Sequence, residues 1–240
     1  MKNILKSTLV VFIIFITVSS CKKKDEPVPP IVYDTAELVT RNYLTSASGF
    51  DWLVNGNKNS TDLRYAFGSK GPFQWNADSI AAVILSINDA DTGTEVFSTT
   101  LTVEKDKSYY SGLVGSSTSG TVVFINNDPT PPATGNVRIR FLQAYQDIGA
   151  VDISIGGITA DHKKVTNLEF AEMSAYIEVS LADASTMIVC TNTGVAPDEA
   201  TNLLTIGANT SHEAGKIYEE ALSSLTTDPI SKFTLFVTEQ

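Results

Sequence analysis

The residues that commonly do chemistry are few in this sequence, and their spacing fits no catalytic centre. The only two histidines are His162, in ADHKKV, and His212, in TSHEAG, and each polar segment predicts a solvated loop. Residues 115–120, GSSTSG, miss the spacing of a nucleophile elbow by one residue and predict a hairpin loop. No His-x-x-x-His pair offers two zinc ligands from one element. We therefore predict a protein with no catalytic residues, no metal and no cofactor.

Two of the many acidic residues stand at matching positions. Asp51 in GFDWLVNG corresponds to Asp152 in AVDISIGG, and in both runs an apolar residue precedes the Asp and Gly ends the run. We interpret both carboxylates as structural acceptors of backbone hydrogen bonds. Glycosidase chemistry would instead require two carboxyl groups facing each other across a cleft.

The segment NDADTGTE at residues 88–95 allows two readings. Asp89, Asp91 and Gly93 imitate the beginning of a calcium loop, in which alternating oxygens wrap the ion. The closing Glu of such a loop is not at the required distance, and Asp, Thr and Gly also serve turn geometry. We therefore predict a hairpin turn between two strands, with calcium binding as the weaker alternative.

Aromatic side chains gather in RYAFGSKGPFQW, residues 64–75. Tyr65, Phe67, Phe73 and Trp75 surround a Gly-Ser-Lys-Gly-Pro turn. Aromatic faces beside polar groups suit sugar rings or peptide contacts, so these four residues are the candidate ligand-binding set. The alternative is that they fill a hydrophobic core.

The amino end predicts export and lipid attachment. Lys2 and Lys6 precede an apolar run of about ten residues, which matches a signal-peptide core and is too short to span a bilayer. VSSC, ending at Cys21, resembles the bacterial lipobox, which implies a signal peptide at 1–20 and an acylated mature end anchored in a membrane. An ordinary signal peptide with a chance cysteine is the alternative.

The residues after Cys21 predict where the anchor lies. KKKDEP resembles the export signal of Bacteroidota surface lipoproteins, which implies the extracellular face of the outer membrane; a charged spacer facing the periplasm is the alternative. The prolines of EPVPPIV favour an extended tether over residues 21–35.

Charge and cysteine content exclude several classes of protein. Removing Lys2 and Lys6 from the 17 basic residues leaves 15 against 27 acidic ones, a net charge of −12 for the mature chain. Nucleic-acid binding would need a basic patch, and the lysines at 22–24 are the only one. Cys190, in TMIVCT, has no partner once Cys21 is acylated, so we predict a small buried apolar residue.

The rest of the sequence predicts strands in two repeated blocks. Beyond the GFDWLVNG and AVDISIGG pair, KDKSYYSGLVG at 105–115 corresponds to EAGKIYEEALS at 213–223. The proline-dense PTPPATG at 129–135 predicts a linker. We expect an all-β chain of two tandem immunoglobulin-like antiparallel β-sandwiches, at 36–128 and 136–240. Residues 212–225 are ambiguous between helix and strand.

Alternation along individual runs supports this expectation. In VRIRF, residues 137–141, the apolar residues Val137, Ile139 and Phe141 point inward. Arg138 and Arg140 are then expected to point outward from the sheet.

One family resembles this pattern. VRIRFLQAYQDIGAVDISIGG, with Gly215, Lys216 and Tyr218 further on, resembles the domain of unknown function 4397, and a second copy fits the first block, where Asp106-Lys107 replaces Gly-Lys. The two copies would cover nearly all of 36–240. The resemblance implies a β-sandwich in an extracytoplasmic setting and transfers no catalytic residue.

These observations predict a non-catalytic cell-envelope lipoprotein, displayed on the surface, that acts as a ligand-binding, adhesion or structural module. Its expected partners are the membrane, through Cys21, and a glycan or protein ligand. The alternatives are a glycan-processing enzyme or accessory subunit of a polysaccharide-uptake system, and a periplasmic assembly factor.

Overall fold

The computed structural model describes residues 31–44, 48–64, 67–77, 82–115, 120–198, 202–206, 212–224 and 233–239. The predicted signal peptide, Cys21 and most of the predicted tether lie outside these residues. No helix within the described ranges is long and apolar enough to cross a membrane.

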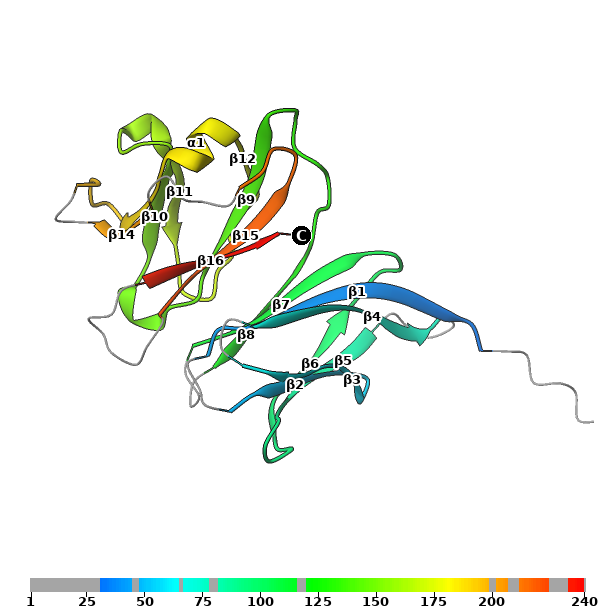
Figure 1. Cartoon of the computed structure of the whole chain (residues 1–240). Helices are drawn as coiled ribbons and strands as arrows, with labels where there is room; N and C mark the ends of the chain where they lie inside the picture. Colours follow the sequence, from blue (N-terminus) through cyan, green and yellow to red (C-terminus); the bar gives the residue numbers. More distant parts are fainter. Residues whose placement is uncertain are drawn as a thin grey trace, which may run out of the picture. The chain divides into compact units, whose positions relative to one another are not determined.

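The described chain is built from strands, as the sequence predicts (Figure 1). The first half forms two sheets. One has the order β4-β1-β7-β8 and the other β3-β2-β5-β6. Their bounds are β1 Tyr33–Asn42, β2 Phe50–Val54, β3 Asn57–Leu63, β4 Gly68–Asn76, β5 Ala82–Asp89, β6 Glu95–Thr102, β7 Ser108–Val114 and β8 Thr121–Asn126. The predicted start of the first sandwich, residue 36, falls inside β1.

The second half also forms two sheets, with the orders β12-β9-β15-β16 and β11-β10-β13-β14. Their bounds are β9 Asn136–Gln143, β10 Val151–Ile155, β11 Lys163–Leu168, β12 Ile177–Ser180, β13 Ile188–Asn192, β14 Asn202–Ile206, β15 Ile217–Ser224 and β16 Phe233–Glu239. Adding eight to each strand number of the first half gives the strand order of the second. All neighbouring strands are antiparallel except the β1–β7 and β9–β15 pairs, which are parallel.

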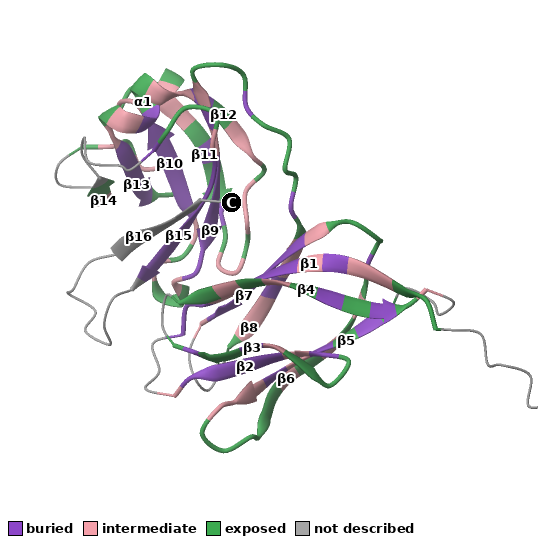
Figure 2. Cartoon of the chain, turned by 45° about the vertical axis from the view of Figure 1, so that its right-hand side comes forward, coloured by how far each residue is buried: buried purple, intermediate pink, exposed green. Residues whose placement is uncertain are grey.

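Each half has its own core between its two sheets, so each is a β-sandwich (Figure 2). Trp52, Leu85 and Tyr109 lie in the first core, and Ile139, Ile153 and Tyr218 lie in the second. The inward alternation of Val137, Ile139 and Phe141 is confirmed, because all three are buried in the second core. The all-β sandwich prediction is therefore confirmed.

A tyrosine closes the loop before the parallel strand in both sandwiches. The backbone N–H of Glu104 donates to the hydroxyl of Tyr109 over 2.6 Å, and that of Glu213 donates to Tyr218 over 2.7 Å. A buried tyrosine that bonds to backbone a few residues upstream resembles the corner found in immunoglobulin-like sandwiches. It fixes each loop against its own core.

Residues 212–225, which the sequence left ambiguous, contain the strand β15 rather than a helix. Residues 217–223 are all buried in this central strand between β9 and β16, and that burial overrides the helix-forming Glu and Ala residues. The helices that do form are short: η1 Gln146–Ile148, η2 Ala160–His162 and α1 Leu181–Thr186. Ser180 caps α1 by accepting the N–H of Asp183 over 3.0 Å.

Arg140 corrects the expectation that the outer face of β9 is open to water. Its side chain points out of the sheet but is only 2% exposed, because it pairs with the buried Glu219 and with Asn127. Its guanidinium also lies 4.5 Å from the ring centroid of Tyr176. A buried ion pair with several hydrogen bonds keeps this charge inside the molecule.

Candidate functional site: a groove at the edge of the first sandwich

A groove of about 390 Å³ lies between β3 and β4 of the first sandwich. These are the end strands of two different sheets, so no further strand of the described chain is paired beyond either of them. The lining residues come from the start of β1, the β2–β3 hairpin and the middle of β4. They are Tyr33, Val54, Asn57, Lys58, Asn59, Pro72, Phe73 and Gln74.

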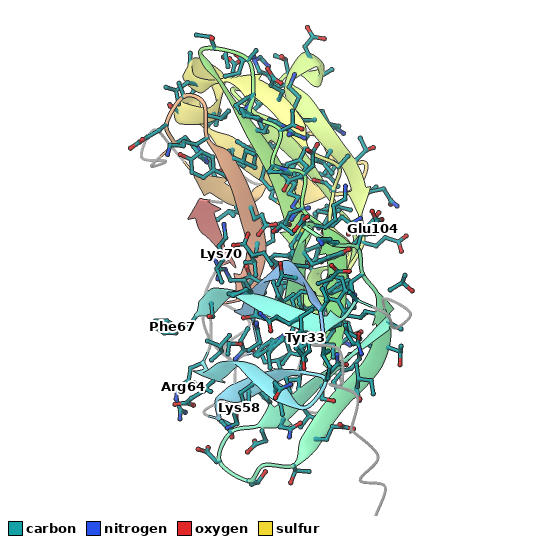
Figure 3. All side chains as sticks on the ribbon, turned by 90° about the vertical axis from the view of Figure 1, so that its right-hand side faces the viewer. Tyr33, Lys58, Arg64, Phe67, Lys70 and Glu104 are labelled. Atoms are coloured by element: carbon teal, nitrogen blue, oxygen red, sulfur yellow. The ribbon has the colours of Figure 1, made fainter. Side chains whose placement is uncertain are left out.

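Local geometry explains how these residues come together. Asn55-Gly56 forms the two-residue turn between β2 and β3, with positive φ at both positions, as the Asn-Gly pair favours. The turn places Asn57 and Asn59 at the start of β3. Along β4, Phe73 is buried while Gln74 is exposed, and Tyr33 lies opposite Asn76 at the same end of β4. Figure 3 shows Tyr33 beside the ribbon of β4 and Lys58 beside that of β3.

Lys58 is the cation of the groove, and it is already paired. Its Nζ lies 2.5 Å from Oδ2 of Asp51, which lies behind it in β2. Burial raises the pKa of Asp51, but the hydrogen bonds from Lys58 and from the backbone N–H of Asp62 outweigh burial, so its pKa is lowered. Asp51 is therefore ionised at neutral pH and neutralises Lys58.

Three side-chain amides carry the remaining polarity. Asn59 donates through Nδ2 to the carbonyl of Pro72 over 3.2 Å, while its Oδ1 is buried without a hydrogen-bond partner. The amides of Asn57 and Gln74 make no hydrogen bond to any residue that the structure describes. Unpartnered amides beside an apolar floor of Val54 and Phe73 can bind an external polar group.

The structure separates the four predicted binding aromatics. Phe73 and Trp75 pack in the first core, with ring centroids 5.7 Å apart, so their rings fit the alternative reading of this segment. Phe67 is 68% exposed and points away from the sandwich (Figure 3). Tyr65 lies outside the described residues. The aromatic ring at the groove is that of Tyr33, which is 54% exposed and which sequence reasoning missed.

Asp51 and Asp152 have the structural role that their matching positions predict. Each stands where the pairing of its strand with the next shifts register, and each accepts a backbone N–H through Oδ1 over 2.9 Å, from Asp62 and Asn167 respectively. Each also binds a lysine, because Lys163 lies 2.6 Å from Asp152 as Lys58 lies near Asp51. The carboxylates thus satisfy N–H groups that the bulges leave without a strand partner.

Asp89 and Asp91 lie in the hairpin turn between β5 and β6. Asp89 Oδ1 accepts the backbone N–H groups of Asp91 and Thr92, over 3.0 and 2.8 Å. The hydrogen bonds from Thr92 are the main cause of the lowered pKa of Asp89. This oxygen therefore holds the turn together, and no group of metal-ligating residues occurs among the described ranges.

Of the two histidines, one corrects the prediction of a solvated loop. His162 is half-buried and bonds Thr159 through Nδ1 over 2.8 Å. His212 is buried, and its Nε2 lies 2.7 Å from Oε1 of the buried Glu220. The prediction failed for His212 because the partner stands eight residues away on β15. Cys190 is buried as predicted, and burial raises the pKa of its thiol to about 12.

The second sandwich has a groove of about 240 Å³ along β11 and the segment leading into β12. Its lining includes Lys164, Thr166, Glu172 and Ser174 over an apolar floor. One carboxylate is present here and none lines the first groove. Neither groove thus places two lining carboxyl groups opposite each other.

No curated protein matches the chain. Among solved structures, a match is found to the crystal structure of CBMbc (family CBM26) from Eubacterium rectale Amy13K in complex with maltoheptaose. It is 13% identical, covers 84% of this chain and 97% of that chain, and has a TM-score of 0.24.

The chain also matches one protein family, the domain of unknown function DUF4397, over residues 38–154. The match begins in β1 and ends in β10, so it crosses the proline-rich segment at 129–135. It occurs in one copy, where the sequence resemblance led us to expect two. Residues 38–154 therefore contain a DUF4397 domain.

Proposed function

We propose that this protein is a non-catalytic lipoprotein, anchored through Cys21 on the extracellular face of the outer membrane, that binds a ligand in the β3–β4 groove. The observation that carries the proposal is the groove lining. Tyr33 and the amides of Asn57 and Gln74 are presented beside an apolar floor without partners of their own in the described chain. Such lining is typical of recognition sites that orient a ligand through a few polar groups.

The proposed anchor limits where the ligand lies. Tyr33 follows Cys21 by 33 − 21 = 12 residues. An extended chain of that length spans at most about 40 Å. A ligand in the groove would then belong to the layer close to the membrane surface, such as a polymer of the same cell envelope.

The anchor and its orientation can be tested separately from the groove. Mass spectrometry of the mature protein is expected to show an acylated Cys21 as its first residue, and Cys21→Ser is expected to release the protein from the membrane fraction. Protease added to intact cells is expected to cut the surface-displayed protein. An unmodified mature end, or a protein protected in intact cells but cut after lysis, contradicts the respective part of the proposal.

The groove is tested by ligand capture with the detergent-solubilised mature protein. Extracts of envelope polysaccharide and of envelope protein are passed over the wild type and over Tyr33→Ala. Retention by the wild type that the variant loses supports the proposal. If both proteins retain the ligand equally and circular dichroism shows that the variant is folded, the ligand binds outside this groove and the proposal is wrong. Turnover of any retained polymer would favour the alternative, a glycan-processing enzyme.

A further inference from the structure

The chemistry of the β3–β4 groove also specifies a class of ligand, and this step rests on the proposed function. The groove carries no net charge once the partner of its lysine is counted. Lys58 is paired with Asp51, and the lining contains no carboxylate. A charged ligand would therefore compete with Asp51 for Lys58 or find no counter-charge, and a neutral ligand meets neither cost.

The hydrogen-bonding groups of the groove require a ligand that both donates and accepts. Each amide of Asn57 and Gln74 offers N–H donors and a carbonyl acceptor, while Asn59 has one N–H already used by Pro72 and its Oδ1 buried. Phosphate and carboxylate groups only accept. A hydroxyl group does both, so a ligand rich in hydroxyls matches this lining.

A peptide strand fits this edge poorly. Adding a strand to β4 would use the backbone groups of its free edge. Pro72 lies in the middle of β4 at the groove and has no N–H, and its carbonyl already accepts from Asn59. The edge is therefore interrupted at the position where an added strand would need it.

The groove also presents flat apolar surface, from the rings of Tyr33 and Pro72. Tyr33 is 54% exposed at the groove, and Pro72 is exposed on the adjacent strand β4. Such surfaces pack against the C–H faces of sugar rings, while the hydroxyls of the sugar reach the amides. We propose that the β3–β4 groove binds a neutral, hydroxyl-rich oligosaccharide chain.

The experiment compares ligand classes on the detergent-solubilised mature protein by isothermal titration. The probes are short neutral oligosaccharides of α-linked and β-linked hexoses, uronic-acid and sulfated oligosaccharides, and extended peptides. The proposal expects at least one neutral oligosaccharide to bind with an affinity that changes little with salt. Tyr33→Ala is expected to weaken that binding by about tenfold or more, which corresponds to about 1.4 kcal/mol.

Matched variants make the result specific to the groove. Tyr33→Phe keeps the ring and is expected to retain most of the affinity, whereas Asn57→Ala with Gln74→Ala removes the amides and is expected to abolish measurable binding. Thr166→Ala, in the second groove, is expected to change nothing. Unfolding midpoints of all variants confirm that each is folded.

Two outcomes overturn the proposal in different ways. Binding that depends on Tyr33 but occurs only with charged oligosaccharides or with peptides contradicts the ligand class and leaves the proposed function standing. If no probe and no envelope extract binds in a way that Tyr33→Ala weakens, both the class and the proposed function fail.

Discussion

The edges of the two sandwiches share one strand arrangement and differ in what their polar groups do. At β3–β4 the amides of Asn57 and Gln74 have no partner in the described chain. Along β11, by contrast, Lys164 Nζ donates to the carbonyl of Asp161 over 3.0 Å, and Glu172 accepts the N–H of Glu169 over 3.0 Å. The same scaffold thus builds a groove twice, and the two grooves differ in how far their lining is already partnered; the proposed function assigns the ligand to the less partnered one.

Ser174 of the second groove shows the same contrast. Its hydroxyl accepts the N–H of Phe141 and donates to the carbonyl of Ala175, each over 2.9 Å. A hydroxyl engaged on both sides has little left for a ligand. The comparison teaches that an equivalent position in the fold does not imply an equivalent site.

The two cores also differ in the side chains that fill one matched position. In the first, Trp52 fills the core and donates through Nε1 to Ser111 over 3.3 Å. In the second, Ile153 stands at the place of Trp52, and the buried pair of His212 and Glu220 occupies the space beside Tyr218. His212 Nδ1 and Glu220 Oε2 have no hydrogen-bond partner in the described part of the chain.

The largest effect is expected from breaking this pair with His212→Val. The change leaves Glu220 buried without its partner, and loss of one member of a buried pair costs about 3–5 kcal/mol of unfolding free energy. Burial already raises the pKa of Glu220, and His212 opposes that shift, so the variant should raise the pKa further. A carboxyl pKa that is raised in the folded state stabilises that state at low pH. This stabilisation is lost as the pH rises through the raised pKa.

Urea unfolding at neutral and mildly acidic pH tests this expectation. The unfolding free energy of His212→Val should increase on acidification by more than that of the wild type. Counting from the matched Tyr109 and Tyr218, Val103 and Ser111 stand at these two positions in the first core. The double variant His212→Val, Glu220→Ser carries the same residue types and should recover part of the loss. An equal deficit at both pH values would show that the pair is not coupled in this way.

A smaller effect is expected from the matched aspartates. Asp152 accepts from Lys163, Asn167 and Gly194, whereas Asp51 accepts from Lys58 and Asp62. Asp152→Asn should therefore lower the free energy of unfolding by about 1–3 kcal/mol relative to the wild type. Asp51→Asn should lower it by less. Thermal unfolding of the two variants in parallel measures the difference. A larger loss for Asp51→Asn would contradict the claim that Asp152 contributes more to stability.

The pH dependence of the Asp152 effect follows from its pKa. Burial raises the pKa of Asp152, but the hydrogen bonds from Lys163 and the backbone outweigh burial and lower it. Its contribution to stability is therefore present above the ordinary carboxyl pKa and is lost as pH falls through the lowered value. The gap between wild type and Asp152→Asn should close in strong acid.

The smallest effect is expected at the β5–β6 hairpin. Asp89→Ala removes the acceptor of the turn and should lower the unfolding midpoint only slightly, because the carboxylate is exposed. Because the carboxylate oxygen is used by the turn, calcium should leave the unfolding midpoint of the wild type unchanged. A midpoint that rises with calcium and loses this response in Asp89→Ala would revive the calcium reading.

Local patterns in the sequence predicted much of the fold. The alternation of Val137, Ile139 and Phe141 identified the buried face of β9, and the matched Asp51 and Asp152 identified a shared structural position. Arg140 and His212 were misjudged because their partners Glu219 and Glu220 lie on another strand, and no local pattern reports such contacts.

The candidate groove overlaps the predicted binding stretch in part. The aromatic stretch 64–75 contains Pro72, Phe73 and Gln74 of the groove, and Asn55-Gly56 signals the hairpin that places Asn57 beside them. Tyr33 lies in a segment that the sequence assigned to the tether. The site escaped prediction because the three segments meet there only through the pairing of β1 with β4 and the packing of β3 beside β4.

Hydrogen exchange of the mature protein, with and without a neutral oligosaccharide, tests the central claim most directly. The account predicts slower amide exchange at residues 57–59 and 73–74 on addition of the sugar, with no change at residues 164–168 of the second groove. Slower exchange along β11 instead, or no change at either edge at saturating sugar, would contradict it.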